Sequence, residues 1–416
     1  MILLAIFVTL VFLYSLGSQW LQRTPLTPPI VFTAAGMLTF LVLPGLRERE
    51  VALHLFLRLA EIGLVLILFT DSSRTDLRLL RSSRSLPSRL LGAGMLLTIA
   101  LGALAALIVL RQLSFWEAGI LAAILAPTDA GLGQVIVSSP RVPVRIREAL
   151  NVEAGLNDGL SVPFLMFFIA LAQAGGESPR AGLLQFAVEQ LGVGALVGVG
   201  IGLAGGGLLG LARRQGWMAE SFQQLAVIAL PLLCALASEP IGASMFIAAF
   251  VAGLAVQAGF PEAGRHSVEF TEELGQVLSF AVFFLFGLLV TRAWQQFDST
   301  VVLYAVLSLT VVRMLPVAIA LGGTGLNRAT VLFIGWFGPR GLASIVLGLV
   351  YLEQEAHLPG ESAIRLAVMM TVLLSIFAHG LSAAPGIGLY ARKIAALDAA
   401  TPERRGVEET PPAVSA

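Results

Sequence analysis

Residues 123–163 read AILAPTDAGLGQVIVSSPRVPVRIREALNVEAGLNDGLSVP, and this stretch decides the fold class. Two apolar segments flank a short basic loop, and each carries acid: Asp129 in the first, Glu153 and Asp158 in the second. A carboxylate at bilayer depth costs about 2.5–3.5 kcal/mol on insertion scales, so acids there are rare and mostly functional. The stretch therefore predicts two membrane helices that line an ion or proton pathway. A kinked helix with hydrogen-bonded, purely structural acids is the alternative.

The first of these segments also contains a helix break. Pro127 lacks a backbone donor, and Gly131 and Gly133 weaken the following turn. Such a break survives at membrane depth only where it lines a cavity or is buried in protein. It offers ions free backbone groups and two half-helix ends. A second break is predicted within 328–352, where three glycines and a proline surround Arg340.

The composition is that of an integral membrane protein surrounded by lipid. Of its 416 residues 57% are hydrophobic and 12% charged, whereas soluble domains carry about 25% charged residues. The formal net charge is zero, which argues against nucleic acid as a partner. The single cysteine excludes an intramolecular disulfide, and no Cys/His spacing suggests zinc or iron. We therefore expect no resident cofactor.

Apolar runs of roughly 20 residues predict an all-α polytopic membrane protein with about thirteen transmembrane helices. The expected spans lie near 2–20, 27–45, 53–70, 89–110, 116–137, 146–173, 183–212, 221–238, 240–257, 267–290, 299–321, 328–352 and 363–390. Because arginines concentrate in one alternate set of loops, the positive-inside rule assigns that set to the cytoplasm. We expect a multi-pass protein of the plasma (inner) membrane, with its N-terminus outside and its C-terminus cytoplasmic.

The two predicted breaks fall at equivalent positions when six spans form each half and the seventh is a linker. Broken helices at matching positions are typical of two inverted repeats that cross at a shared site. We expect a transmembrane domain at 1–395, with a first repeat at about 1–180, a linker helix at 181–215 and a second repeat at 216–395. The polar segment 396–416 is expected to be a disordered cytoplasmic tail.

Arg313 is a charged residue inside the apolar segment 299–321 and needs an acidic partner there. Glu153 is the natural candidate for this ion bridge, and Glu189 is the alternative. Arg340 is the other arginine at membrane depth, so the partner of Glu153 stays open between Arg313 and Arg340.

At these residues the sequence resembles the NhaP-type sodium/proton antiporters of the monovalent cation:proton antiporter superfamily. The resemblance covers nearly the whole chain, and it is carried by FTDSSRTDLRLLR, APTDAGLGQVIV, LNVEAGLNDG and GWFGPRGLASIVLGL. It implies secondary active exchange of a monovalent cation for H⁺ and no enzymatic reaction. Sodium is the expected cation, with potassium and lithium as alternatives. It also implies a homodimer with a dimerisation part and a mobile core.

The resemblance assigns the site residue by residue. Asp158 would bind either the cation or the proton, with Asn157 as its polar neighbour. Thr128 and Asp129 would lie at the crossing of the broken helices and, with Asp158, supply oxygen ligands to the cation. In the family an asparagine–aspartate pair accompanies electroneutral exchange. Asp71, a further acid at membrane depth, is an auxiliary candidate.

The resemblance also places Glu153 in an ion bridge, to Arg313 by preference. Two positions depart from the family pattern. Ala130 stands where many relatives carry proline, and Ala154 stands where close relatives often have serine. Ala154 removes a potential oxygen ligand, which leaves cation affinity and choice open.

One carboxylate that holds H⁺ or a cation, never both, would couple the two fluxes. Two other classes of function remain as alternatives. An intramembrane aspartyl protease would need Asp129 and Asp158 to share a proton at close range. An ion channel is the second alternative, and the sequence contains no filter-like repeat that would favour it. A transporter-derived sensor or scaffold is disfavoured because Asp158 is present.

Overall fold

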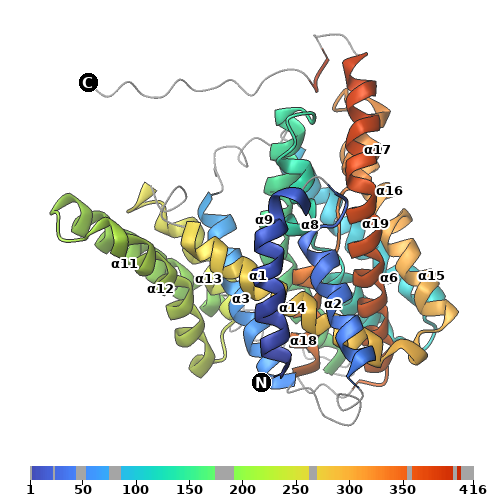
Figure 1. The fold of residues 1–416 in the computed structure, drawn as a ribbon, viewed down its shortest axis with the longest axis horizontal. Helices are drawn as coiled ribbons and strands as arrows, with labels where there is room; N and C mark the ends of the chain where they lie inside the picture. The colour runs from blue at the N-terminus through green and yellow to red at the C-terminus, as the bar shows by residue number, and fades with distance from the viewer. Residues whose placement is uncertain are drawn as a thin grey trace.

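The structure is a computed structural model that describes residues 2–21, 24–43, 53–74, 86–173, 192–261, 269–353, 358–396 and 401–403. Within these ranges all regular secondary structure is helical, which confirms the predicted fold class. Figure 1 shows the helices as one bundle, with the N-terminus at one end and the last turns of the final long helix at the other.

The first half of the chain forms α1 (Ile2–Leu21), α2 (Pro28–Val42), α3 (Leu53–Arg74), α5 (Leu86–Arg89), α6 (Met95–Val109), α7 (Phe115–Ile124), α8 (Ala130–Val137) and α9 (Val144–Gln173). The second half forms α11 (Gly194–Arg214), α12 (Glu220–Ser238), α13 (Met245–Val256), α14 (Glu269–Arg292), α15 (Ser299–Leu309), α16 (Val311–Ala320), α17 (Arg328–Trp336), α18 (Leu342–Glu353) and α19 (Glu361–Ala395). A π-helical turn at Leu90–Gly94 joins α5 to α6.

The described helices follow the predicted apolar segments. Eight of them are long and apolar enough to cross a membrane, and shorter apolar helices accompany them. The segments 116–137 and 328–352 are each split in two, as the predicted breaks require. The count of thirteen spans and the inverted repeats stay predictions. Part of the expected linker helix, including Glu189, lies outside the described residues.

An additional interruption divides the segment 299–321 at Thr310, whose backbone lies at φ −108° and ψ −90°. The Thr310 hydroxyl donates to the carbonyl of Val306 at 2.6 Å, and such back-bonding often bends helices. This bend comes three residues before Arg313 and was not evident from hydropathy, because the whole segment is apolar.

The helices pack as two groups that meet along α9 and α18. In one group α2, α3 and α14 pack together with α11, α12 and α13; in the other α6 to α9 pack with α15 to α19. At the junction Gly155 of α9 lies against Asp71 of α3, and Gly159 lies against Phe250 of α13. The acidic segment of α9 is therefore positioned where the two groups touch.

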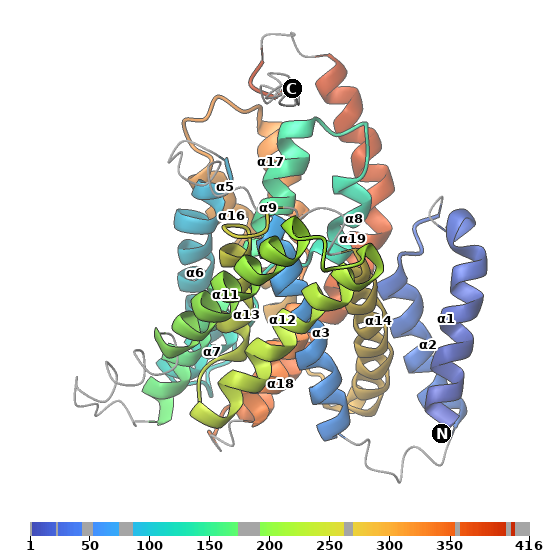
Figure 2. The same cartoon turned by 90° about the vertical axis from the view of Figure 1, so that its left-hand side faces the viewer.

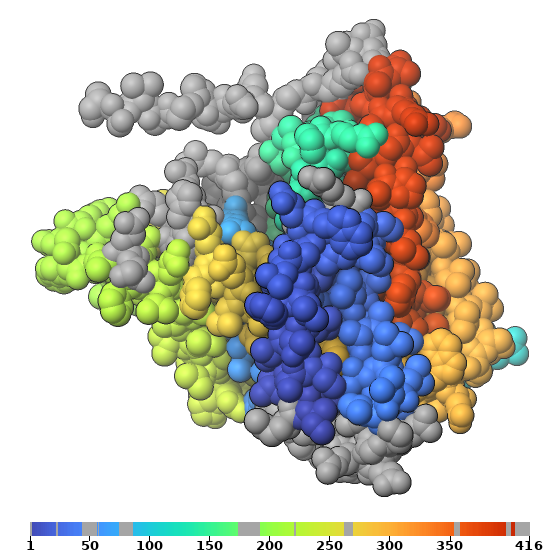
Figure 3. Space-filling view, viewed as in Figure 1, coloured from blue at the N-terminus to red at the C-terminus, as the bar shows by residue number. Residues whose placement is uncertain are grey.

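Helix α1 lies on the outside of the bundle. None of its residues is buried, and Figure 3 shows it running across the surface of the molecule. Its attachment is aromatic: the Phe7 ring packs against Phe32 at 5.9 Å and Phe284 at 6.0 Å, while Tyr14 packs against Phe32 and Phe280. The face of α1 turned away from α2 and α14 is open to lipid or to another protein surface.

Part of the expected disordered tail is folded back onto the bundle. Residues 401–403 lie within 396–416, yet Glu403 is only 2% exposed. Arg145 of α9 and Asn327, just before α17, both bind this short segment. Hydrogen bonds hold this short described segment, and the disordered tail expected at 396–416 stays a prediction. The contacts of the segment also bring the starts of α9 and α17 to the same end of the molecule.

A glycine-lined contact holds α11 against α13. A Cβ on Gly202 would come within 2.7 Å of the Ala252 carbonyl and 2.8 Å of the Ala255 side chain, whereas a Cβ on Gly200 would meet nothing within 4 Å. Small residues at four-residue spacing let membrane helices approach closely. The close approach of α11 thus depends on which side of the helix each glycine occupies.

We expect Gly202→Ala to lower the stability of the detergent-solubilised protein by about 1–3 kcal/mol, since overpacking forces the two backbones apart. Gly200→Ala is the matched control and should be neutral or slightly stabilising, because alanine favours helix over glycine. Thermal melting of the two purified variants makes the comparison. Equal melting temperatures would show that α11 does not rely on this contact.

Candidate functional site

The two broken segments meet at the centre of the second helix group. Helix α7 ends at Ile124 and α8 starts at Ala130, while α17 ends at Trp336 and α18 starts at Leu342. Between these ends the chain is not helical, and the backbone amide of Asp129 donates to the carbonyl of Pro339 at 2.8 Å. The predicted crossing of broken helices is thus present, joined by a backbone hydrogen bond.

Asp129 lies at the N-terminal ends of both second half-helices. Its Oδ1 accepts from the amide of Leu132 at 2.7 Å, and its Oδ2 accepts from the amide of Leu342 at 2.5 Å. A helix N-terminus carries partial positive charge, which a carboxylate offsets. Gly341 has to lack a side chain, because an added Cβ would overlap the Asp129 carboxylate. One acid therefore caps α8 and α18 together.

Arg340 binds the C-terminal ends of the two first half-helices, α7 and α17, with a positive charge. Its Nε donates to the carbonyl of Leu125 at 2.9 Å, just after α7, and its Nη1 donates to that of Gly338 at 2.6 Å, just after α17. The side chain is fully buried. The sequence had included Arg340 in the ion bridge; the structure instead places its guanidinium on these carbonyls, because helix C-termini carry partial negative charge.

Glu153 forms its ion pair with Arg313. Nη1 and Nη2 of Arg313 donate to the two carboxylate oxygens at 2.6 and 2.9 Å, and both side chains are about 3% exposed. This bidentate geometry is the strongest form of an arginine–carboxylate contact. It fastens α9 to α16 directly after the bend at Thr310.

Asp158 and Asn157 lie one turn further along α9. The side-chain amide of Asn157 donates to the Thr128 hydroxyl at 2.8 Å, which links α9 to the non-helical segment between α7 and α8. The Oδ1 atoms of Asn157 and of Asp158 are buried with no hydrogen-bond partner among the described residues. A buried acceptor without a donor is costly, so both oxygens can accept a hydrogen bond from water or coordinate a cation, and the Asp158 carboxylate can also take up a proton.

Asp71 is a further acid at the site, and it belongs to α3 in the other helix group. It lies on the last turns of α3 beside Gly155, and it is close enough to Asp129 and Asp158 for the three carboxylates to repel one another. The structure therefore brings together Asp158, Asp129, Thr128, Asn157 and Asp71. Glu153 and Arg313 form a separate pair beside them.

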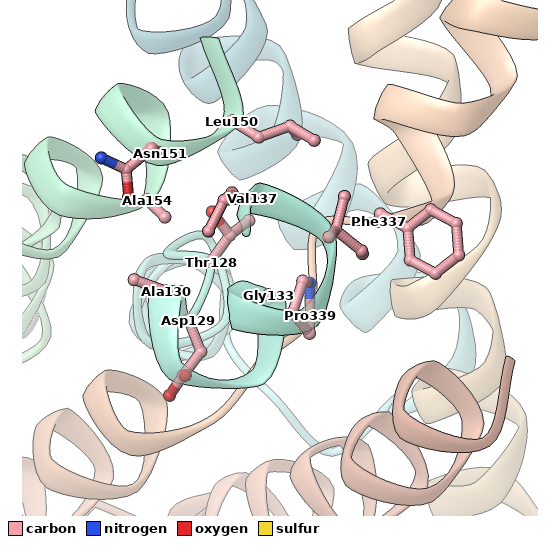
Figure 4. Close-up of a pocket in the computed structure, with 11 residues that line it drawn as sticks. Thr128, Asp129, Ala130, Gly133, Val137, Leu150, Asn151, Ala154, Phe337 and Pro339 are labelled. Carbon is pink, nitrogen blue, oxygen red and sulfur yellow. The ribbon is translucent and has the colours of Figure 1, made fainter. Parts of the chain in front are cut away.

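A small cavity of about 10 Å³ opens next to the crossing (Figure 4). Thr128, Asp129, Ala154 and Pro339 are among the residues that line it. This space is about the size needed for one water molecule. Ala154 contributes only a methyl group to the wall, so the hydroxyl that serine would supply is missing at the cavity itself.

Sequence reasoning did not identify the groups that hold Arg340 from α19. The Ser375 hydroxyl accepts from the Arg340 amide at 2.6 Å, and it lies 3.1 Å from Nδ1 of His379. Trp336 packs on the His379 ring at 5.0 Å. The only signal in the sequence was a serine and a histidine four residues apart in an apolar helix, which ordinary structural roles also explain.

The ion pair yields a stability prediction. Breaking a buried pair by removing one partner costs about 3–5 kcal/mol, because the other charge is left uncompensated. We therefore expect Glu153→Ala to lower the melting temperature in detergent more than Asp158→Ala does. Replacing both Glu153 and Arg313 by leucine should recover part of the loss. Equal melting temperatures for the two single variants would contradict a stabilising bridge.

Comparison with known proteins agrees with this geometry. Residues 5–386 match the model of the transmembrane sodium/hydrogen exchanger family. The K⁺/H⁺ antiporter NhaP2 of Shewanella oneidensis is 27% identical over 276 residues, 64% of this chain and 46% of that protein. The Na⁺/H⁺ antiporter 2 of Zygosaccharomyces rouxii is 26% identical over 314 residues, 67% of this chain and 38% of that protein. The chain thus spans about half or less of the length of these curated relatives.

Among solved structures, the sodium proton antiporter MjNhaP1 from Methanocaldococcus jannaschii superposes with a TM-score of 0.75 at 19% identity. The match covers 95% of this chain and 98% of that chain, so the fold is shared over nearly its whole length. The predicted resemblance to NhaP-type antiporters is confirmed. The match over residues 5–386 shows that the chain belongs to the transmembrane sodium/hydrogen exchanger family.

Proposed function

We propose that the chain is a secondary active transporter that exchanges a monovalent cation for H⁺ by competition at Asp158. The observation that carries the proposal is the buried Asp158 carboxylate, whose Oδ1 has no described partner, beside two crossed half-helices. Relatives named as Na⁺/H⁺ and K⁺/H⁺ antiporters support the reaction type. Sodium, potassium and lithium are all candidate substrates.

The neighbouring charges explain why Asp158 is the exchanging group. Asp129 accepts backbone hydrogen bonds on both oxygens, and Glu153 is paired with Arg313. Those acids are satisfied by fixed donors, whereas Asp158 is not. A bare carboxylate in a dry site is expensive, so Asp158 is stable only with a proton or a cation bound. That requirement excludes crossing the membrane empty and thereby couples the two ions.

The cation would be held by few protein oxygens. Hard monovalent cations take oxygen ligands, and the candidates are Asp158, the Thr128 hydroxyl, Asp129, freed backbone carbonyls and water. Asn157 orients Thr128 through its amide and presents its own Oδ1. Asp71, which lies on α3 beside Gly155 of α9, is an auxiliary acid.

Alternating access would come from the group formed by α6–α9 and α15–α19 moving against the group that contains α2, α3 and α11–α14. We place the chain in the plasma membrane with its C-terminus in the cytoplasm, as the arginine distribution indicates. A homodimer is the expected assembly. The aspartyl protease alternative is weakened, because its second acid, Asp129, caps two helices instead of sharing a proton with Asp158.

Asp158→Asn should abolish exchange while the protein stays folded, because asparagine binds neither a proton nor a cation competitively. The measurement is proton flux in proteoliposomes after addition of Na⁺, K⁺ or Li⁺, with a melting curve as the control for folding. Cation-dependent proton flux through the Asp158→Asn protein would refute the mechanism. Cation flux without counter-movement of protons in the unaltered protein would identify a channel.

The exchange should also be electroneutral. Asp158 is the single exchanging acid, and Asn157 is neutral where a second acid would carry another proton. Exchange of one H⁺ per cation moves no net charge, so the transport rate should be independent of membrane potential. Each uncompensated charge that crossed would instead contribute about 2.3 kcal/mol per 100 mV. Na⁺-driven flux with and without a valinomycin–K⁺ clamp tests this. A transient current on a supported membrane would instead implicate Asp129 as a second carrier.

A further inference from the structure

The segment 401–403 binds the bundle at the N-terminus of α17, the first half of one of the broken helices. Glu403 is 2% exposed, and its Oε1 accepts from the backbone amide of Asn327 at 2.6 Å and from the Thr330 hydroxyl at 3.0 Å. Asn327 is the N-cap of α17, and Thr330 lies in its first turn. The carboxylate is thus placed at the positive end of the first half-helix of the second broken span.

The contacts around Glu403 form a connected network. Tyr390 of α19 donates to the Thr330 hydroxyl at 3.2 Å, and Thr330 in turn donates to Glu403. Arg145, in the first turn of α9, donates to the Pro402 carbonyl at 2.8 Å. The two residues 402 and 403 therefore join the starts of α9 and α17, which are far apart in the chain.

The other end of α17 leads directly to the candidate site. The helix has nine residues and is therefore about 13 Å long at about 1.5 Å per residue. Immediately after it, Phe337 and Pro339 line the cavity that Thr128 and Asp129 also line. Because the Pro339 carbonyl binds the Asp129 amide, a shift of so short and rigid a helix would move the wall of the site.

We propose that Glu403 is a positioning residue for exchange: it fixes the N-terminus of α17 and thereby sets the position of residues 337–339 against Thr128 and Asp129. The inference rests on the proposed function for its transport readout. It gives the C-terminal segment a role in the affinity of the site, although that segment lies outside the membrane-spanning helices. Anything that detaches residues 402 and 403 would then weaken cation binding.

The test compares Glu403→Ala, Glu403→Gln and a chain ending at Ala396 with the matched control Glu409→Gln, a carboxylate of the same tail. Cation concentration is varied on the side assigned to the cytoplasm, and the half-saturating concentration and maximal rate are measured separately. We expect the half-saturating concentration to rise about three- to tenfold for Glu403→Ala and for the shortened chain, since small displacements of positioning groups have effects of this order. The half-saturating concentration of Glu403→Gln should lie between that of these two variants and that of the unaltered protein, because the glutamine amide oxygen still accepts hydrogen bonds.

Amide hydrogen exchange at residues 327–331 and melting temperature complete the design. We expect faster amide hydrogen exchange at residues 327–331 in Glu403→Ala whether or not transport can be measured. Absence of cation/proton transport in the unaltered protein would therefore count against the proposed function alone. If Glu403→Ala lowers the melting temperature but leaves the half-saturating concentration unchanged, Glu403 is only structural and the inference is overturned. Unchanged amide exchange and unchanged transport would overturn it as well.

Discussion

The structure depends on the opposite charges that hold the crossing of the two broken helices. Each break leaves one helix N-terminus and one C-terminus at membrane depth, with about half a unit of partial charge at each. Asp129 binds the two N-terminal ends, and Arg340 binds the two C-terminal ends. Backbone groups that lipid could not satisfy are thereby satisfied within the protein. Exchanging the two charges would place like charge against like at all four ends.

This arrangement leaves Asp158 as the distinctive acid of the site. Asp129 and Arg340 offset the helix ends, and Glu153 and Arg313 offset each other, so the fixed charges are internally compensated. The Oδ1 atom of Asp158 has no such compensation among the described residues. In the proposed exchange, a bound cation or proton would relieve the cost of that uncompensated oxygen. A framework that compensates the charges of Asp129, Arg340, Glu153 and Arg313 would thereby leave Asp158 as the carboxylate that responds to ions.

The sequence was sufficient for the helical class and for the residues that gather at the crossing, because prolines, glycines and acids are conspicuous in apolar runs. It was insufficient wherever the partner of a group is a backbone atom. Nothing in the pattern GPRG distinguishes an arginine that pairs with Glu153 from one that binds the carbonyls of Leu125 and Gly338. The bend at Thr310 and the burial of Glu403 escaped prediction for the same reason, since both involve hydrogen bonds with backbone atoms, the carbonyl of Val306 and the amide of Asn327.

Several candidate oxygen ligands already accept hydrogen bonds within the protein, and this limits how many could coordinate a cation. Both Asp129 oxygens accept helix amides, and the Thr128 hydroxyl accepts from Asn157. Among the described candidate ligands, Asn157 and Asp158 each keep an unpartnered oxygen. They are adjacent residues of one helix, so these two oxygens cannot enclose an ion from several sides. Ala154 adds none at the cavity wall. A cation here would keep water in its coordination shell, so the cost of partial dehydration, more than the shape of a protein cage, would discriminate between sodium and potassium.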